Sequence, residues 1–277
     1  MEGEIVLSFD NQDDSVLDYT RLKTSFESLG LFDKPVIVHA SLKPFGRIQG
    51  GAEAVLDAML ASFAGVIMPT HTYKTKIIPD VGPPNNAITY GHGIYKNKMA
   101  VPFHPGLRAD PMMGILPEAL RKHPSAARTA HPILSFAGIN ADPILFTQTL
   151  YEPLAPIGAL AEQDGWVVLI NVDHTANTSI HYGEKLAGRK QFIRWALVDD
   201  RVVECPNYPG DSMGFQTIEE HIQFDTRRIN LEAGFIQAMP LTRLLEVVQE
   251  LIKKDPLALL CEQTDCERCK VVRATGK

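Results

Sequence analysis

Two histidines and two carboxylates fall within one short stretch of the chain, residues 165–184, GWVVLINVDHTANTSIHYGE. Its apolar part, residues 166–172, is typical of a buried strand, and Asp173 and His174 follow directly where that strand ends. Sites of open α/β sheets form at the carboxyl ends of strands, and histidine beside a carboxylate transfers protons near neutral pH. The stretch therefore predicts a catalytic site for proton transfer.

His181 and Glu184 fall on the helix that the sequence predicts next. They are three positions apart and share one helical face, so they either position or polarise His174 or form a structural hydrogen bond against the core. Zinc ligation by His174 and His181 fits less well. The chain has no H-E-x-x-H motif, and no third ligand is placed beside them.

A glycine-rich turn, HASLKPFGRIQGG at residues 39–51, lies between a predicted strand and a predicted helix. Gly46, Gly50 and Gly51 let the backbone approach a ligand closely, and the helix start near Ala52 offers free amides. The turn has neither the Gly-Lys-Ser/Thr ending of a Walker loop nor a G-x-G-x-x-G pattern. It is either a phosphate or nucleotide loop or a set of turn and packing residues.

The next strand is followed by THTY, residues 70–73. This segment could place the hydroxyls of Thr70, Thr72 and Tyr73 and the imidazole of His71 in the same crevice, or it could be an N-capping turn. The stretch after it, residues 74–110, is rich in Pro, Gly and Asn and contains aromatic and histidine side chains such as His104. A loop this long inside a compact enzyme predicts a substrate-covering segment.

The remaining pattern alternates short apolar runs with helical periodicity, which predicts one α/β domain over residues 1–277. We expect a three-layer α/β/α sandwich with a central mixed sheet. The expected strands are residues 35–39, 65–69, 133–139 and 166–172, with a hairpin of 191–198 and 201–205 turning at 199–200. The expected helices are residues 18–29, 53–63, 112–121, 156–163, 217–224 and 241–254, with a short one after Asp142.

Composition excludes several functional classes. The 277 residues are 45% hydrophobic with a net charge of −6, which argues against general disorder and against a nucleic-acid surface. No apolar run is long enough to cross a bilayer, so no membrane partner is expected. The first fourteen residues are acidic and lack the apolar core of a secretory signal, so we expect a cytoplasmic protein.

Three of the four cysteines, Cys261, Cys266 and Cys269, lie in the tail at residues 257–277. This distribution is not that of a disulfide-framed secreted fold. The spacing is that of zinc ligands, and a structural site would need a fourth ligand from elsewhere, such as Cys205 or a histidine. The alternative is a reduced, partly exposed tail without metal.

The ordered combination of these motifs resembles the aminoglycoside 3-N-acetyltransferase family, the antibiotic N-acetyltransferases of YokD-like fold, which are not GNAT proteins. The resemblance covers about residues 36–215. It is carried, in order, by VHASLKPFGRIQGGAEAVLDAML, VIMPTHTY, MGILPEALRKHPSAARTAHPILSFAGI, PIGALAEQDGWVVLINVDHTANTSIHYGE and ECPNYPGDSMGF.

This resemblance implies an α/β/α fold and acetyl transfer from acetyl-CoA to an amine, with His174 as catalytic base. Asp173, His181 and Glu184 are its expected catalytic partners. Backbone amides near Ser41 and Leu42 are expected to donate to the tetrahedral oxyanion. The residues expected to bind acetyl-CoA are His39, Ser41, Leu42, Gly46, Gly50, Thr70 and Thr72. Those expected to bind the acceptor are Tyr73, His104, Asp110 and Asn177.

The chain departs from the family at two positions. Thr175 stands where the family typically has an acid after the histidine, and His104 precedes Pro105 where the family commonly has Asp. Both changes remove negative charge that would bind a polycationic sugar. The acceptor is therefore either an aminoglycoside 3-amino group or a smaller amine. A zinc-dependent hydrolase or a zinc-stabilised binding protein is the alternative from another class.

Overall fold

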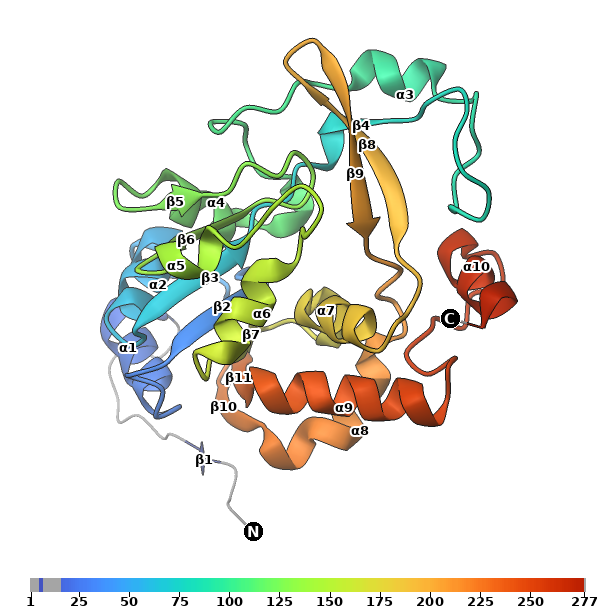
Figure 1. The fold of residues 1–277 in the computed structure, drawn as a ribbon. Helices are drawn as coiled ribbons and strands as arrows, with labels where there is room; N and C mark the ends of the chain where they lie inside the picture. Colours follow the sequence, from blue (N-terminus) through green and yellow to red (C-terminus); the bar gives the residue numbers. More distant parts are fainter. Residues whose placement is uncertain (1–4, 7–15, 277) are drawn as a thin grey trace.

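The computed structural model describes residues 5–6 and 16–276. The prediction that the first fourteen residues are not a secretory signal falls mostly outside these described residues. An eight-stranded mixed sheet with the order β1-β10-β11-β7-β2-β3-β6-β5 forms the centre of the fold (Figure 1). Its strands are β1 (Ile5–Val6), β2 (Pro35–Ala40), β3 (Gly65–Pro69), β5 (Ala127–Arg128), β6 (Phe136–Ile139), β7 (Trp166–Ile170), β10 (Arg227–Leu231) and β11 (Gly234–Pro240).

The three central strands β7, β2 and β3 run parallel, and their outer neighbours β11 and β6 run antiparallel to them. In register, His39 pairs with Leu169 and Ala40 with Ile170. The carboxyl ends of the three strands therefore meet at one edge of the sheet, where parallel α/β folds build their sites. The segments that follow these strands carry Ser41, Thr70 and His174.

Helices cover both faces of the sheet because side chains along each central strand alternate between two cores. Val36 and Val38 pack into a core with α1, α2 and α4, whereas Ile37 packs into the opposite core with α5, α6, α7 and α9. These helices are α1 (Tyr19–Glu27), α2 (Gly51–Leu60), α4 (Ile115–Lys122), α5 (Asp142–Leu145), α6 (Ala155–Glu162), α7 (Ser179–Leu186) and α9 (Leu241–Lys254). The three-layer α/β/α fold with a mixed sheet is confirmed.

A second sheet of three strands lies outside the large one. It consists of β4 (Lys76–Ile77), β8 (Phe192–Val198) and β9 (Arg201–Tyr208). The hairpin predicted at Asp199-Asp200 is present, with Asp199 at φ 51°, as a tight two-residue turn requires. β4 and α3 (Ile94–Met99) both lie within the segment 74–110, which is therefore partly structured (Figure 1).

Two predicted elements differ in extent for local reasons. The strand predicted over 133–139 is formed only as β6, because the N–H groups of Ile133 and Leu134 donate to the His131 ring (Nδ1, 3.1 and 2.9 Å). The helix predicted over 112–121 begins at Ile115, since Gly114 at φ 84° separates it from a 3-10 turn, η3 (Pro111–Met113).

The helix predicted over 217–224 is divided into three short pieces: η5 (Phe215–Ile218), α8 (Glu219–Ile222) and η6 (Gln223–Asp225). Strands β10 and β11 and the C-terminal helix α10 (Glu267–Thr275) were not predicted at all. Within residues 5–6 and 16–276, no helix is long and apolar enough to cross a membrane.

Candidate active site

His174 lies immediately beyond β7, as predicted, in a short 3-10 turn, η4 (His174–Ala176). The turn forms because the Asp173 carboxylate accepts the backbone N–H of Thr175 at 2.9 Å. The His174 side chain is fully buried, and its backbone N–H donates to the side-chain oxygen of Gln216 at 2.9 Å. The segment that contains η5 and α8 is thereby held against the end of β7.

Both ring nitrogens of His174 face polar side chains. Asn177 Oδ1 accepts the backbone N–H of Ser179 (3.2 Å), so the amide NH₂ of Asn177 faces His174 Nδ1 at 3.4 Å. His174 Nε2 lies 3.1 Å from a carboxylate oxygen of Glu219, although the approach is not aligned as a hydrogen bond.

The charge state of His174 is set by opposing effects. Burial lowers the pKa of His174 below its ordinary value, and the negative charges of Glu219 and Asp173 partly oppose this shift. The ring is consequently neutral at physiological pH and can accept a proton. The Glu219 side chain is 34% exposed, so it links the buried imidazole to the surface.

Glu219 was not predicted, because nothing in its local sequence distinguishes it from other acids on a helix. Asp173 was expected to orient His174 directly, but its exposed carboxylate accepts from the backbone and the hydroxyl of Thr175. Asn177, expected to bind the acceptor, is buried against His174. The carboxylate that faces the ring thus comes from α8, far along the chain.

His181 and Glu184 form the hydrogen bond that their spacing predicted, with 2.8 Å between Nδ1 and Oε2. The second oxygen of Glu184 accepts from Arg189 at 2.9 Å, and Arg189 also donates to the carbonyls of Pro256 and Ala258 (2.8 and 2.9 Å). These contacts correspond to the structural alternative. They fix α7 to the segment that follows α9 and hold the His181 ring against the Phe215 ring.

Three further buried histidines surround the strand ends. Burial lowers the pKa of His39 and His71 to about 3 and of His131 to about 4, and His174 adds to the effect on His39. The Nε2 atom of each of these rings is buried without a hydrogen-bond partner. His39 was predicted as a cofactor-binding residue and the imidazole of the THTY segment, His71, as a further group in the crevice, whereas His131 was not selected.

The three glycines of this turn all have positive φ angles, a region that glycine enters without steric cost. Gly46 and Gly50 have φ values of 64° and 81°, and a Cβ on Gly46 would meet no atom within 4 Å. Gly50 is the N-cap of α2. The N–H of Ser41 donates to the carbonyl of Ile170 at 2.8 Å and is therefore engaged in pairing with β7. Of the two backbone amides predicted to donate to the oxyanion, only that of Leu42 lies outside this pairing.

The polar side chains after β3 are engaged within the protein. Thr70 Oγ1 contacts Ser135 Oγ at 3.2 Å, and Thr72 Oγ1 donates to the Pro132 carbonyl at 2.7 Å. Both threonines are fully buried. The Tyr73 hydroxyl contacts His71 Nδ1 at 3.0 Å. Direct ligand contacts by these side chains stay predictions.

The end of the long loop is held to β3 by backbone and side-chain contacts. The N–H of Asp110 donates to the His71 carbonyl at 2.7 Å, and the Asp110 carboxylate caps η3. Arg128, which the sequence analysis did not select, donates to the carbonyls of Thr70 and Pro105, each at 2.9 Å. His104 is exposed, and its role in acceptor binding stays a prediction.

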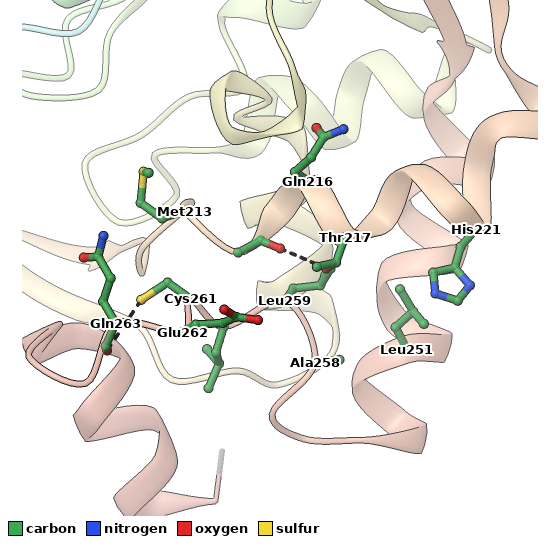
Figure 2. Close-up of a pocket in the computed structure, with 12 residues that line it drawn as sticks. Met213, Gln216, Thr217, His221, Leu251, Ala258, Leu259, Cys261, Glu262 and Gln263 are labelled. Carbon is green, nitrogen blue, oxygen red and sulfur yellow. Dashed lines mark hydrogen bonds between the residues drawn. The ribbon is translucent and has the colours of Figure 1, made fainter.

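A cavity of about 490 Å³ lies between the η5–α8 segment and the C-terminal tail (Figure 2). Gln216, whose side chain accepts the His174 backbone N–H, is one of its lining residues. Among residues 16–276, neither His174 nor His181 belongs to a set of three ligand-type side chains close enough to hold a metal ion.

Known proteins share this fold. The crystal structure of the apoenzyme of aminoglycoside acetyltransferase AAC(3)-IVa superposes with a TM-score of 0.75 at 20% identity, covering 94% of this chain and 98% of that one. The structure of YokD from Bacillus subtilis gives a TM-score of 0.75 at 19% identity, covering 87% and 94%. A structure of AAC-IIIb described as its binary complex with CoASH gives 0.70 at 19% identity, covering 86% and 97%.

Sequence relatives agree with the structural ones. Aminoglycoside N(3)-acetyltransferase VII of Streptomyces paromomycinus is 29% identical over 195 residues, 65% of each chain. The chain therefore spans slightly less than two thirds of the length of this curated relative. Residues 37–253 match the family described as aminoglycoside 3-N-acetyltransferase. Since this match covers most of the chain, the protein belongs to the aminoglycoside 3-N-acetyltransferase family.

Proposed function

We propose that the protein is an acetyl-CoA-dependent N-acetyltransferase whose acceptor is an aminoglycoside 3-amino group or a related amine. The observation that carries this proposal is the contact of 3.1 Å between His174 Nε2 and Glu219, at the carboxyl end of β7. Family membership and the name of the CoASH complex of AAC-IIIb support acetyl-CoA as the co-substrate. Catalysis takes place at the edge of the sheet where β7, β2 and β3 end.

Acetyl-CoA binds against the turn at residues 41–51, which follows β2. Lys43 and Arg47 are exposed on this turn, and their positive charges suit the phosphates of the CoA arm. The open space at Gly46 lets the arm approach the backbone. The thioester carbonyl then lies near Leu42, whose backbone amide donates to the oxyanion.

The acceptor amine reaches the site as an ammonium ion and pairs with the partly exposed Glu219 carboxylate. The ammonium loses a proton to the His174–Glu219 pair, and its nitrogen then attacks the thioester carbonyl carbon. Collapse of the tetrahedral intermediate breaks the carbon–sulfur bond, and the second proton of the nitrogen passes to the departing CoA thiolate. The first proton leaves the His174–Glu219 pair to solvent. The products are an N-acetylated amine and free CoA.

The same carboxylate bears on the choice of acceptor. Thr175 removes the acid that the family typically has directly after the histidine, but Glu219 places negative charge at His174 from another element. The site thus keeps one carboxylate for an ammonium group. A single acid of this kind suits a small amine as well as one amine of a sugar.

The test is release of the CoA thiol, together with the mass of the product, across a panel of aminoglycosides and small amines. The proposal predicts an acetylated product and an equal amount of thiol for at least one amine. Thiol release without acetylated amine, or binding of acetyl-CoA with no product from any amine in the panel, would contradict it.

A further inference from the structure

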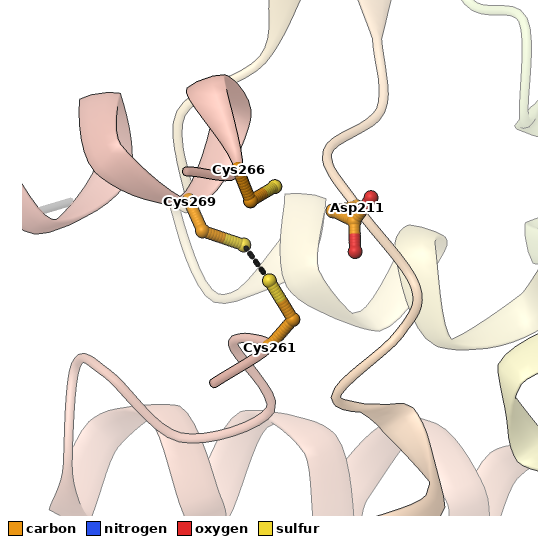
Figure 3. Close-up of side chains that lie close together, drawn as sticks. All are labelled: Asp211, Cys261, Cys266 and Cys269. Carbon is orange, nitrogen blue, oxygen red and sulfur yellow. Dashed lines mark hydrogen bonds between the residues drawn. The ribbon is translucent and has the colours of Figure 1, made fainter. Parts of the chain in front are cut away.

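The C-terminal tail carries a cluster that the acetyl-transfer site does not use. Cys261, Cys266 and Cys269 converge on Asp211, and the four ligand atoms all lie within 4.8 Å of one another (Figure 3). Asp211 comes from the segment between β9 and η5, whereas the cysteines come from the start of α10 and the turn before it. The cluster therefore joins two parts of the chain that are distant in sequence.

The spacing of these atoms is that of a tetrahedral metal site. Zinc ligands at about 2.3 Å from the ion and at tetrahedral angles lie roughly 3.8 Å from one another. Here the Cys261 and Cys269 sulfurs are 3.3 Å apart, and both residues are buried. A small inward or outward rotation of these side chains brings the four atoms to coordination distance.

The surroundings of the cluster orient its ligands. The Asp211 carboxylate accepts the backbone N–H of Met213 (2.9 Å) through one oxygen and the guanidinium of Arg268 (3.0 Å) through the other. Each oxygen keeps a further lone pair for a metal ion. Cys266 is the N-cap residue of the nine-residue helix α10, where the helix dipole favours a thiolate.

Charge around the cluster also suits a dication. Three thiolates and one carboxylate around a divalent ion leave two negative charges in excess. Arg268 lies against Asp211, and Arg273 donates to the carbonyl of Cys261, so two cations balance that excess. Three soft sulfur ligands favour zinc over magnesium or calcium, which prefer oxygen.

We propose that Cys261, Cys266, Cys269 and Asp211 bind one structural zinc ion. Four protein ligands close the coordination sphere, so the site stabilises the fold rather than activating water. The fourth ligand is Asp211, not the suggested Cys205, which lies on β9 and is buried in a core with Phe192 and Tyr208. The ion holds α10 to the segment that leads into η5, where Gln216 contacts His174.

The test is the zinc content of the 277-residue protein after purification, loading with zinc chloride and removal of loosely bound metal. We expect about one zinc per chain in the wild type and a loss of most of it in Cys266→Ser. Asp211→Asn should weaken zinc binding at least about tenfold in competition with a chromophoric chelator. Cys205→Ser and Asp265→Asn, which change the same residue types outside the cluster, should retain the wild-type zinc content.

Cobalt(II) substitution gives a second readout that does not depend on stability. Tetrahedral thiolate ligation predicts strong visible absorption for the wild type and both control variants, and its loss in Cys266→Ser. If the wild-type protein holds no zinc after incubation with zinc chloride, the proposal is overturned. This holds whether the thiols are free or Cys261 and Cys269 form a disulfide. Because metal content is measured without substrate, this result is independent of acetyl transfer.

Discussion

His174 Nε2 and a carboxylate oxygen of Glu219 lie 3.1 Å apart, and the two residues belong to separate segments, η4 and α8. The imidazole is fully buried, whereas the carboxylate is partly exposed. A positive charge on the ring is therefore stabilised mainly by a residue at the protein surface. The negative charge of Glu219 raises the pKa of His174, so substitution of Glu219 should change that pKa.

The first prediction concerns Glu219→Gln. Loss of the carboxylate removes the effect that raises the pKa of His174, so the acidic limb of the pH–kcat/KM profile should move to lower pH. At pH 7.5 kcat should fall on the order of 10²-fold, because the conjugate acid formed during transfer loses its counter-charge. Glu220→Gln, an exposed neighbour, is the matched control. An acidic limb that stays in place in Glu219→Gln would contradict the assigned contact.

A second prediction concerns stability at low pH. The pKa values of His39, His71 and His131 in the folded protein lie near 3 to 4, below the unfolded value of about 6.5. The unfolded chain binds more protons in this window, so stability is complete above pH 6.5 and falls as the pH approaches the folded values. At pH 5 the loss is up to about 2 kcal/mol for each histidine.

Urea unfolding at pH 7.5 and pH 5 measures this loss. His131→Asn should reduce the pH dependence of the free energy of unfolding, because one of the three buried titrating groups is removed. His92→Asn, which changes an exposed histidine, is the matched control and should leave the pH dependence close to that of the wild type. If the free energy of unfolding changes equally between pH 7.5 and pH 5 in the wild type and in His131→Asn, the His131 ring is not buried in its neutral state.

The third prediction concerns the ion pair of Glu184 and Arg189, whose side chains are each only 2% exposed. Glu184→Gln leaves the Arg189 guanidinium buried without a counter-charge, so the free energy of unfolding should drop by about 3–5 kcal/mol. Glu162→Gln, an exposed change on α6, should cost less than about 0.5 kcal/mol. Denaturant unfolding checks both variants. A cost for Glu184→Gln as small as that of the control would exclude a structural role.

The fourth prediction concerns the turn after β2. Removal of the positive charge in Arg47→Ala should raise KM for acetyl-CoA about fivefold, equivalent to about 1 kcal/mol, with little change in kcat. Arg201→Ala, at the exposed tip of the β8–β9 hairpin, is the control and should leave KM unchanged. Steady-state kinetics with acetyl-CoA as the varied substrate distinguishes them. An unchanged KM for acetyl-CoA in Arg47→Ala would show that Arg47 does not bind the CoA phosphates.

Local sequence was sufficient to predict an element where its backbone conformation or burial requires a particular type of residue. The apolar run of β7, the turn at Asp199 and the glycines after β2 all follow from such requirements. His174 was found because the strand that carries it could be recognised. The fold class followed because strands buried on both faces need helices on each side.

Long-range contacts were not visible in the sequence. Glu219 and Arg128 reach the site through tertiary packing, and neither residue type nor spacing distinguishes them from other charged residues nearby. The hairpin of β10 and β11 was missed because polar and apolar side chains do not alternate regularly along it. β10 begins with two arginines, which are not typical of a buried strand. Asp211 completes the cysteine cluster only because the chain folds back after β9. In each case the partner is set by where another segment lies.

The central claim, that His174 accepts the proton of the attacking amine, is tested most directly with His174→Ala. Acetyl transfer at saturating acetyl-CoA and amine should be measured with calorimetric binding of acetyl-CoA to the same preparation. We predict a fall in kcat on the order of 10²- to 10⁴-fold with acetyl-CoA affinity retained. Near-normal kcat in this variant, with acetyl-CoA still bound, would contradict the account.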